Sequence, residues 1–374
     1  MGFILCAGSL VSTLFKRLKI PGLIGAILVG IILSAEVQGF SNDIDVIQTL
    51  ATLGAILLLF TSGLELDPDA FFKVGKRAFF LTTLGVLISV VLGLSFGLLL
   101  GFTIQASFIL GVMISPSSTA IIAQTLITTK KIETVEGETL LTAAILDDVE
   151  GVILLSIALG NWNQGGFSII NFVLTVVLAI LFVFGSIFLG RKYFPKLIED
   201  MERKIPEDIT FAILLGIGLI MAFLATLLGL AAVTGGFIVG VVIPYKKVGE
   251  RMDQSLTLMK DLFGVIFFVS IGLFINPLTL LAVIPIALPI LGISTAGRMI
   301  GGFTGGRLGK FSGKGLWGMV SGLAVQGEVN LIIAQTAVLL GIVSPDFLAI
   351  SAIVVIGSIF ILLPIYQKLC RSFQ

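Results

Sequence analysis

The chain has 374 residues, of which 57% are hydrophobic and 12% charged, and its mean hydropathy is +1.15. This composition excludes an ordinary soluble globular domain, because most of the chain needs a nonpolar surrounding. A formal charge of +1 points to no class of partner, and we expect no nucleic acid to bind. The sequence therefore predicts an all-α polytopic membrane protein, with residues 1–374 as a single integral membrane domain.

Thirteen apolar segments follow one another along the chain, and we expect each to cross the lipid bilayer. They cover residues 2–15, 20–35, 45–63, 78–101, 105–127, 137–159, 168–190, 208–228, 230–244, 256–275, 278–304, 314–340 and 345–367. Several are shorter than the roughly 20 residues that span a bilayer as a helix, so their limits are approximate. The first should be retained rather than cleaved as a signal peptide, because no basic residue precedes it and a basic cluster follows it.

The basic residues indicate how these segments are oriented. With the N-terminus outside, the cytoplasmic regions near the ends of the odd-numbered segments carry 22 of the 23 Lys and Arg residues. The links on the opposite side carry none, as the positive-inside rule requires. The sequence thus predicts an N-out, C-in topology, and the one remaining basic residue, Arg298, lies inside the eleventh segment.

The chain contains few groups for redox or metal chemistry. Its two cysteines, Cys6 and Cys370, should lie near opposite membrane faces, which excludes a disulfide or a shared metal between them. Histidine is absent. Any response to pH near neutrality must therefore come from carboxylates.

The second half of the sequence repeats features of the first. Gly25 and Gly30 recur as Gly235 and Gly240, an offset of 210 residues. This offset spans seven segments, an odd number, so it reverses the orientation. We therefore expect an inverted-topology repeat, with residues 1–160 and 208–374 as its halves and 161–207 as a linker helix and cytoplasmic loop. Such repeats are typical of secondary transporters that work by alternating access.

Two segments should be broken at matching positions. Pro116 interrupts the fifth segment, and at the same offset Gln326, followed by Gly327, falls in the twelfth. Proline removes an amide donor and glycine weakens a helix. Irregular backbone at membrane depth is tolerated only where protein or water satisfies it, and matched breaks in two repeats indicate the binding site.

Two adjacent acids, Asp147 and Asp148, lie in the middle of the sixth segment, and an intramembrane acid is a functional candidate by default. Asp147 lies about 16 Å along a helix from Glu136, and Arg298 about 13 Å from Arg307, so the two can meet at one depth. Neighbours on a helix point about 100° apart, so one acid can pair with Arg298 while the other faces water. The simpler alternative is a fixed ion pair beside a solvated acid, with Arg298 as a snorkelling anchor.

Three further acids are weaker candidates. Glu65 lies near the cytoplasmic end of the third segment, and Glu328 lies deep in the twelfth, where it could act as a gating acid. Glu150 follows Asp147 by about one helical turn, and we expect it to face an outer vestibule.

With these residues in place, the chain resembles the monovalent cation–proton antiporter superfamily, which includes the Kef-like and NapA-like exchangers, over essentially all 374 residues. The segments that carry the resemblance are 63–67 (GLELD), 115–119 (SPSST), 144–148 (AILDD), 267–272 (FFVSIG) and Arg298. The resemblance implies an NhaA/NapA-like fold with two broken crossing helices, and a homodimer in a bacterial or archaeal cell membrane. It also implies no cofactor, with Na+ (or Li+ or K+) and H+ as the transported ions.

The family pattern assigns roles to individual positions. Asp148 matches the acid that binds the cation and the proton alternately, and Asp147 matches the partner of the basic residue, here Arg298. Ser117 and Thr119 match positions that supply polar ligands. Exchangers with two aspartates usually carry lysine rather than arginine, and arginine cannot lose its proton, so the number of protons per cycle stays open. Kef-like exchangers commonly carry glutamine at the first position and a nucleotide-binding domain, both absent from this sequence, which favours Na+ over K+.

The resemblance also suggests which segments move. Segments four to six and eleven to thirteen should form a core, and segments one to three and eight to ten a panel. Gly25, Gly30, Gly235 and Gly240 would allow close helix packing in the panel, where we expect the dimer interface.

Other classes of function remain possible at this stage. A channel or a sodium-coupled solute symporter could share the repeat architecture, and cation flux independent of protons would identify either. An intramembrane aspartyl protease also uses two buried acids, but its carboxylates must face each other, which neighbours on one helix cannot do.

Overall fold

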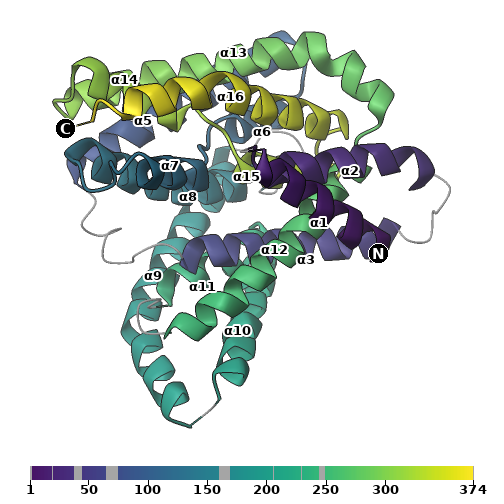
Figure 1. Cartoon of the computed structure of the whole chain (residues 1–374), viewed down its shortest axis with the longest axis vertical. Coiled ribbons are helices and arrows are strands. Elements are labelled where there is room, and N and C mark those ends of the chain that lie inside the picture. Colours follow the sequence, from purple (N-terminus) through teal and green to yellow (C-terminus); the bar gives the residue numbers. More distant parts are fainter. Residues whose placement is uncertain are drawn as a thin grey trace. The chain divides into compact units, whose positions relative to one another are not determined.

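The computed structural model describes residues 2–18, 20–37, 44–64, 75–159, 169–204, 206–228, 230–243 and 249–373. Within these ranges the regular secondary structure is helical throughout, and no strand occurs (Figure 1). The chain divides into two compact units, each built from two stretches distant in sequence. One comprises Met1–Asp69 with Leu159–Pro277, and the other Ala70–Ala158 with Leu278–Gln374.

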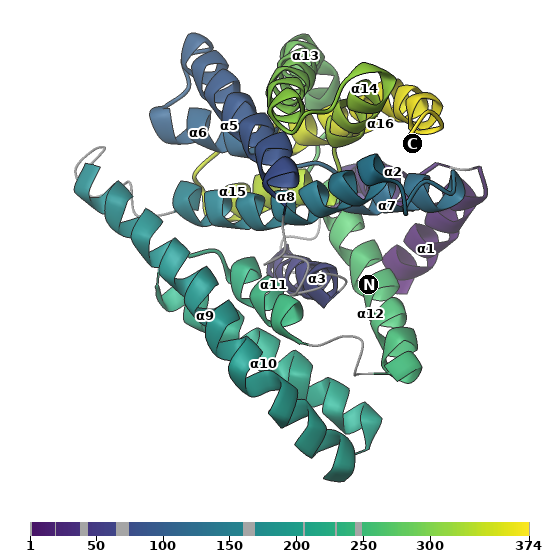
Figure 2. The same cartoon turned by 90° about the vertical axis from the view of Figure 1, so that its left-hand side faces the viewer.

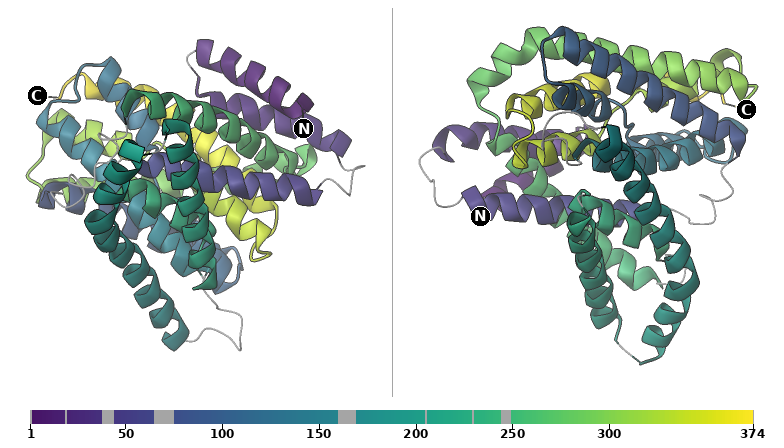
Figure 3. Two further views of the ribbon diagram at one scale, coloured as in Figure 1. Left: turned by 90° about the horizontal axis from the view of Figure 1, so that it is seen from below. Right: turned by 180° about the vertical axis from the view of Figure 1, so that it is seen from behind.

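The first unit holds the helices of the expected panel and the seventh segment. They are α1 (Gly2–Arg17), α2 (Gly22–Val37), α3 (Ile44–Leu64), α9 (Ile169–Lys204), α10 (Glu207–Leu227), α11 (Ala232–Val242) and α12 (Gly249–Leu273). Helix α2 packs against α1 and α12, while α11 packs against α3 and α10, and Figure 2 shows α11 beside α3. Figure 3 shows α9 and α10, both drawn in teal, as two long helices.

Glycines permit the closest approaches in this unit. A methyl group on Gly30 of α2 would lie 2.7 Å from the Cα of Gly272 in α12. One on Gly240 of α11 would lie 3.0 Å from the carbonyl carbon of Gly63 in α3. Both distances are too short for a side chain, so these helix pairs can pack as they do only with glycine at the contact.

The second unit holds the helices of the expected core. They are α5 (Lys76–Leu99), α6 (Ile104–Met113), α7 (Thr119–Thr128), α8 (Val135–Leu159), α13 (Pro277–Leu308), α14 (Gly313–Leu323), α15 (Glu328–Leu339) and α16 (Asp346–Cys370). An apolar cluster that includes Leu140, Met319 and Tyr366 joins α8, α14 and α16. Helices α5, α7, α8, α13 and α15 supply side chains of the candidate site, and α14 supplies a backbone carbonyl group.

The helices follow the thirteen predicted apolar segments, and the fifth and twelfth are interrupted where predicted. Helix α6 ends at Met113 and α7 begins at Thr119, while α14 ends at Leu323 and α15 begins at Glu328. Among the described residues, five helical stretches are long and apolar enough to cross a membrane: Val46–Leu64, Lys76–Leu99, Leu280–Leu308, Gly313–Leu339 and Asp346–Cys370.

The main departure from the predicted elements is α9. We expected the seventh helix to end near residue 190 and a loop to follow, but α9 continues to Lys204 with Pro195 inside it. The extension is rich in Lys, Arg, Glu, Leu and Met, all good helix formers, which explains why the chain stays helical after its apolar run ends.

Candidate functional site

The two helix breaks touch each other inside the second unit. The amide of Ser118, at the start of α7, donates a hydrogen bond of 2.8 Å to the carbonyl oxygen of Val325, which precedes α15. A methyl group on Gly327 would lie 2.6 Å from the Cβ of Ser118. Gly327 is therefore needed for the close approach of the two breaks, in addition to weakening the helix. Pro116 lies in the middle of the first break.

Side chains satisfy the carbonyl groups that the breaks release. Asn330 Nδ2 donates to the carbonyl oxygen of Met113 at 2.7 Å, and Gln326 Nε2 donates to that of Ile114 at 2.8 Å. Ser294 Oγ also donates to the Ile114 oxygen, at 3.1 Å. Because buried polar groups are costly when unpaired, these amides and this hydroxyl stabilise the irregular backbone.

Asp147 on α8 is fully buried and accepts hydrogen bonds from three helices or breaks. Arg298 Nη2 of α13 forms an ion pair with Oδ2, and the amide and hydroxyl of Ser117 donate to the same oxygen, the amide at 2.6 Å. Thr82 of α5 donates to Oδ1 at 3.3 Å. The expected pairing of Asp147 with Arg298 is thus present, and it is completely enclosed by protein, which a snorkelling arginine would not be.

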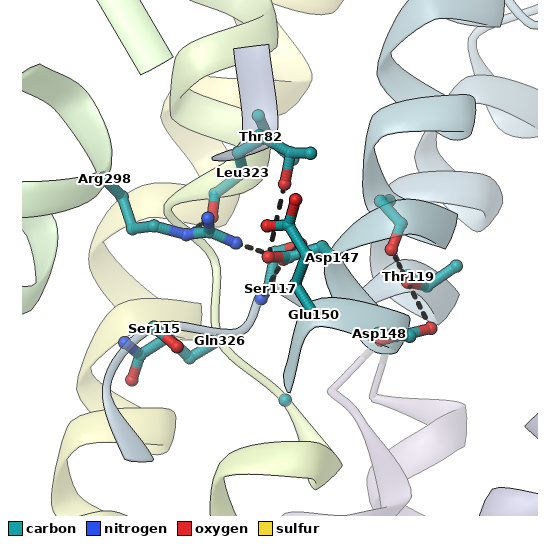
Figure 4. Close-up of polar contacts among 12 residues, drawn as sticks. Thr82, Ser115, Ser117, Thr119, Asp147, Asp148, Glu150, Arg298, Leu323 and Gln326 are labelled. Atoms are coloured by element: carbon teal, nitrogen blue, oxygen red, sulfur yellow. Dashed lines mark hydrogen bonds and ion pairs between the residues drawn. The ribbon is translucent and has the colours of Figure 1, made fainter. Parts of the chain in front are cut away.

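Asp148 points in a different direction from Asp147, as expected for neighbours on a helix (Figure 4). Its side chain is 2% exposed, and its Oδ2 accepts a hydrogen bond of 2.9 Å from Thr119 Oγ1. The same hydroxyl lies 3.2 Å from the carbonyl oxygen of Ala144. The threonine hydroxyl therefore lies between a buried carboxylate and a carbonyl oxygen, and oxygen atoms of these kinds suit a hard cation.

Arg298 connects the acid pair to the second helix break. Its Nε donates to the carbonyl oxygen of Leu323, the last residue of α14, at 3.1 Å. Its Nη2 pairs with Asp147, and its Nη1 is buried without a hydrogen-bond partner among the described residues. One guanidinium thus satisfies the end of a half-helix and neutralises an acid.

The structure treats the three weaker candidate acids differently: they are Glu328, Glu65 and Glu150. Glu328 is the first residue of α15 and is partly exposed, so it lies at a helix start rather than inside a continuous helix. Glu65 lies outside the described residues. Glu150 had been expected to face a vestibule, but its Oε1 accepts from Thr83 and its Oε2 is buried.

The sequence reasoning missed Thr82, Ser294 and Asn330. Each is a polar residue inside an apolar segment, a signal that is too common to single them out without knowing which residues lie next to the breaks. Among the described residues, no group of three or more His, Cys, Asp or Glu side chains is arranged to hold a metal ion.

Comparison with known proteins gives one matching family and several similar antiporters. The sequence profile of the family described as "Sodium/hydrogen exchanger, transmembrane" matches residues 3–368. The chain is 29% identical to the Na(+)/H(+)-K(+) antiporter GerN of Bacillus cereus, over 98% of this chain and 94% of that protein. It is also 29% identical to a Na(+)/H(+) antiporter of Enterococcus hirae, over 89% of this chain and 87% of that protein.

A potassium relative and a solved structure complete the comparison. The chain is 25% identical to the K(+)/H(+) antiporter subunit KhtU of Bacillus subtilis, over 80% of this chain and 74% of that protein. The fold is similar to that of the sodium proton antiporter MjNhaP1 from Methanocaldococcus jannaschii, with a TM-score of 0.75 and 18% identity. That similarity covers 100% of this chain and 97% of the archaeal one.

Proposed function

The chain belongs to the sodium/hydrogen exchanger family and is a cation/proton antiporter, and from this premise we propose that Asp148 binds the transported cation and the proton in turn. The proposal rests on one observation. Asp147 and Asp148 are adjacent and both buried, but Arg298 forms an ion pair with Asp147, while the hydroxyl of Thr119 donates a hydrogen bond to Asp148.

Charge makes the exchange obligatory at such a site. A bare carboxylate is costly inside a membrane protein, and binding either a proton or a cation removes that cost. Asp148 therefore changes its access to the two sides with one of these ligands bound, and the bare form cannot readily do so. A cation leaving on one side is replaced by a proton, and the reverse holds on the other side.

The oxygen atoms near Asp148 define the proposed cation ligands. Thr119 Oγ1 donates to Asp148, the carbonyl oxygen of Ala144 lies 3.2 Å from that hydroxyl, and Ser117 Oγ donates to Asp147. We assign Na+ as the favoured cation, with Asp148, Asp147, Ser117 and Thr119 as its ligands. Potassium is the second candidate, because one similar protein is a K(+)/H(+) antiporter subunit and another carries both ions in its name.

The architecture that we propose is an inverted repeat working by alternating access in the cell membrane, with the N-terminus outside. The matched glycines support the repeat. Gly30 and Gly240 stand at equivalent positions of the two halves, and each approaches a glycine in a helix of the opposite half, Gly272 and Gly63. A homodimer through the panel helices is part of the same proposal.

Exchange by purified protein in liposomes tests the assignment of Asp148. A pH-sensitive dye inside the vesicles would report proton movement driven by Na+, Li+ or K+ gradients at a clamped membrane potential. We expect Asp148→Asn to abolish this movement while leaving the protein folded, because it removes the only charge that alternates between ligands. Exposed Glu138 on the same helix supplies the control, since Glu138→Gln should retain normal exchange.

Two outcomes would contradict the proposal. Exchange by Asp148→Asn above about a tenth of the wild-type rate, a loss of less than 1.4 kcal/mol in the barrier, would remove Asp148 from the carrier role. Cation flux in the wild-type protein that is independent of proton movement would indicate a channel or a symporter instead.

A further inference from the structure

Two buried polar atoms near the ion pair have no hydrogen-bond partner within the part of the chain that the structure describes. They are Nη1 of Arg298 and Oε2 of Glu150, a donor with positive charge and an acceptor from a carboxyl group. A buried donor or acceptor that is left unpaired is costly, and more so when it is charged. Other buried polar atoms of the described residues, such as Ser89 Oγ and Gln326 Oε1, also have no partner, but Nη1 is the one cationic donor and Oε2 the one carboxyl oxygen among them, which suggests that the two meet in another state.

Glu150 is placed to take part in such a contact. It follows Asp147 by three residues on α8, which puts both side chains on one face of the helix. Its Oε1 accepts from the Thr83 hydroxyl of α5, which leaves Oε2 for another donor. Glu150 lies close enough to Asp147 and Arg298 to feel the charge of each, and its carboxyl group overlies their ion pair in Figure 4.

Arg298 has the geometry to exchange one acid for the other. Its Nε donates to the carbonyl oxygen of Leu323 and its Nη2 to Asp147, which leaves Nη1 as the donor for a second acid. Its planar fork carries donors for two carboxyl groups at once. Gly85 of α5 lies beside Nη1, where a methyl group would come within 3.1 Å, so the absence of a side chain leaves room there.

We propose that Glu150 is the second acid of Arg298 and holds the guanidinium whenever Asp147 turns to the transported cation. This inference rests on the proposed function, in which Asp147 and Asp148 share the cation. Without Glu150, a cation that takes Asp147 would leave Arg298 buried with no acidic partner, an arrangement that is strongly unfavourable. Glu150 is thus a positioning residue that lets Asp147 act as a ligand.

A double-mutant cycle of thermal stability tests the contact without requiring transport. Asp147→Asn leaves Arg298 with Glu150, and Glu150→Gln leaves it with Asp147, so we expect modest losses of Tm from each single change. The double variant has no acid for Arg298, and its loss of Tm should exceed the sum of the two single losses by about 5 °C or more, since neighbouring groups in one network do not add. Additive losses would overturn the proposal.

Transport kinetics give a readout that a purely structural role would not move. In Glu150→Gln, Arg298 should hold Asp147 more firmly, and the KM for Na+ should rise about tenfold while the maximal rate changes less than about twofold. Glu150→Asp should restore most of the affinity, and Glu138→Gln is the matched control on the same helix. An unchanged KM in Glu150→Gln would also overturn the proposal.

The two tests separate this inference from the proposed function. If the wild-type protein shows no exchange at all, the proposed function fails, while the stability cycle still decides whether Glu150 holds Arg298. If exchange depends on Asp148 but the cycle is additive, the proposed function stands and the role of Glu150 is wrong.

Discussion

The two helix breaks occupy matching positions in the sequence but carry different chemistry. The first, between α6 and α7, directs Ser117 and Thr119 at Asp147 and Asp148. The second, between α14 and α15, directs the amide side chains of Gln326 and Asn330 at carbonyl groups of the first. The first break therefore supplies ligands to the acids, and the second supports the first.

This difference shows that two helix breaks at matching sequence positions can have different functions. Interrupting a helix at both positions lets the two segments cross, as the hydrogen bond from Ser118 to Val325 illustrates. Which break then serves the ion depends on whether its side chains are hydroxyls, which can ligate a cation, or amides, which suit backbone groups. Changes in the second break should thus reduce stability, and changes in the first should reduce cation affinity.

The largest effect is expected from Arg298→Ala, because Arg298 contacts both the acid that the first break binds and the end of α14 at the second break. It would leave Asp147 buried without its partner and Leu323 without its donor, at a cost of about 3–5 kcal/mol in the free energy of unfolding. Asp147→Asn combined with Arg298→Ala removes both charges and should recover much of that stability, measured by thermal denaturation in detergent. The double variant should also keep some exchange, because Asp148 remains.

A double variant no more stable than the worse single one would show that Asp147 and Arg298 are not paired. Arg298 would then be better explained as an anchor that reaches the membrane interface.

Asn330→Leu should give the next largest loss of stability. It removes the donor to the carbonyl oxygen of Met113 and the acceptor for the amide of Gly327. Losing both bonds should cost about 2–4 kcal/mol, since each buried group left unpaired costs about 1–3. The KM for Na+ of the protein that folds should stay within about twofold of wild type. A large rise in KM at unchanged stability would instead make the second break part of the ion site.

Gly327→Ala probes the close approach of the breaks by steric means. The added methyl group would lie 2.6 Å from the Cβ of Ser118, and overpacking of this kind typically costs about 1–3 kcal/mol. Gly216 in α10 is a matched control, because a methyl group there would meet nothing within 4 Å. Thermal denaturation of the two variants should separate them clearly, and equal stability would mean that the breaks do not approach as described.

The smallest effect on stability, but a clear one on affinity, is expected from Thr119→Val. Valine keeps the shape of threonine but loses the hydroxyl that donates to Asp148. Hydrogen bonds to charged groups contribute about 1.5–3 kcal/mol, so the KM for Na+ should rise by about tenfold or more. Thr119→Ser should retain the wild-type KM. A normal KM in the valine variant would exclude Thr119 from the ligand set.

Much of this protein follows from its sequence alone. Hydropathy locates the helices because a chain in lipid must satisfy its backbone hydrogen-bonding groups internally. A long apolar segment does so by forming a helix. Pro116 and Gly327 mark the breaks, and the depth of Asp147 and Arg298 along their helices predicts that they can pair. The charged end of α9 was misjudged, since hydropathy shows where lipid contact ends but not where the helix ends.

The tertiary structure decided which polar groups meet, and in which direction each acid points. Ser294, Asn330 and Thr82 look in the sequence like ordinary polar residues in apolar helices, and only packing brings them to the breaks and to Asp147. Glu150 accepts a hydrogen bond from Thr83 of α5 instead of facing the expected vestibule, for the same reason. Sequence spacing sets depth and angle along one helix, but the partner of a buried charge depends on which other helices are its neighbours.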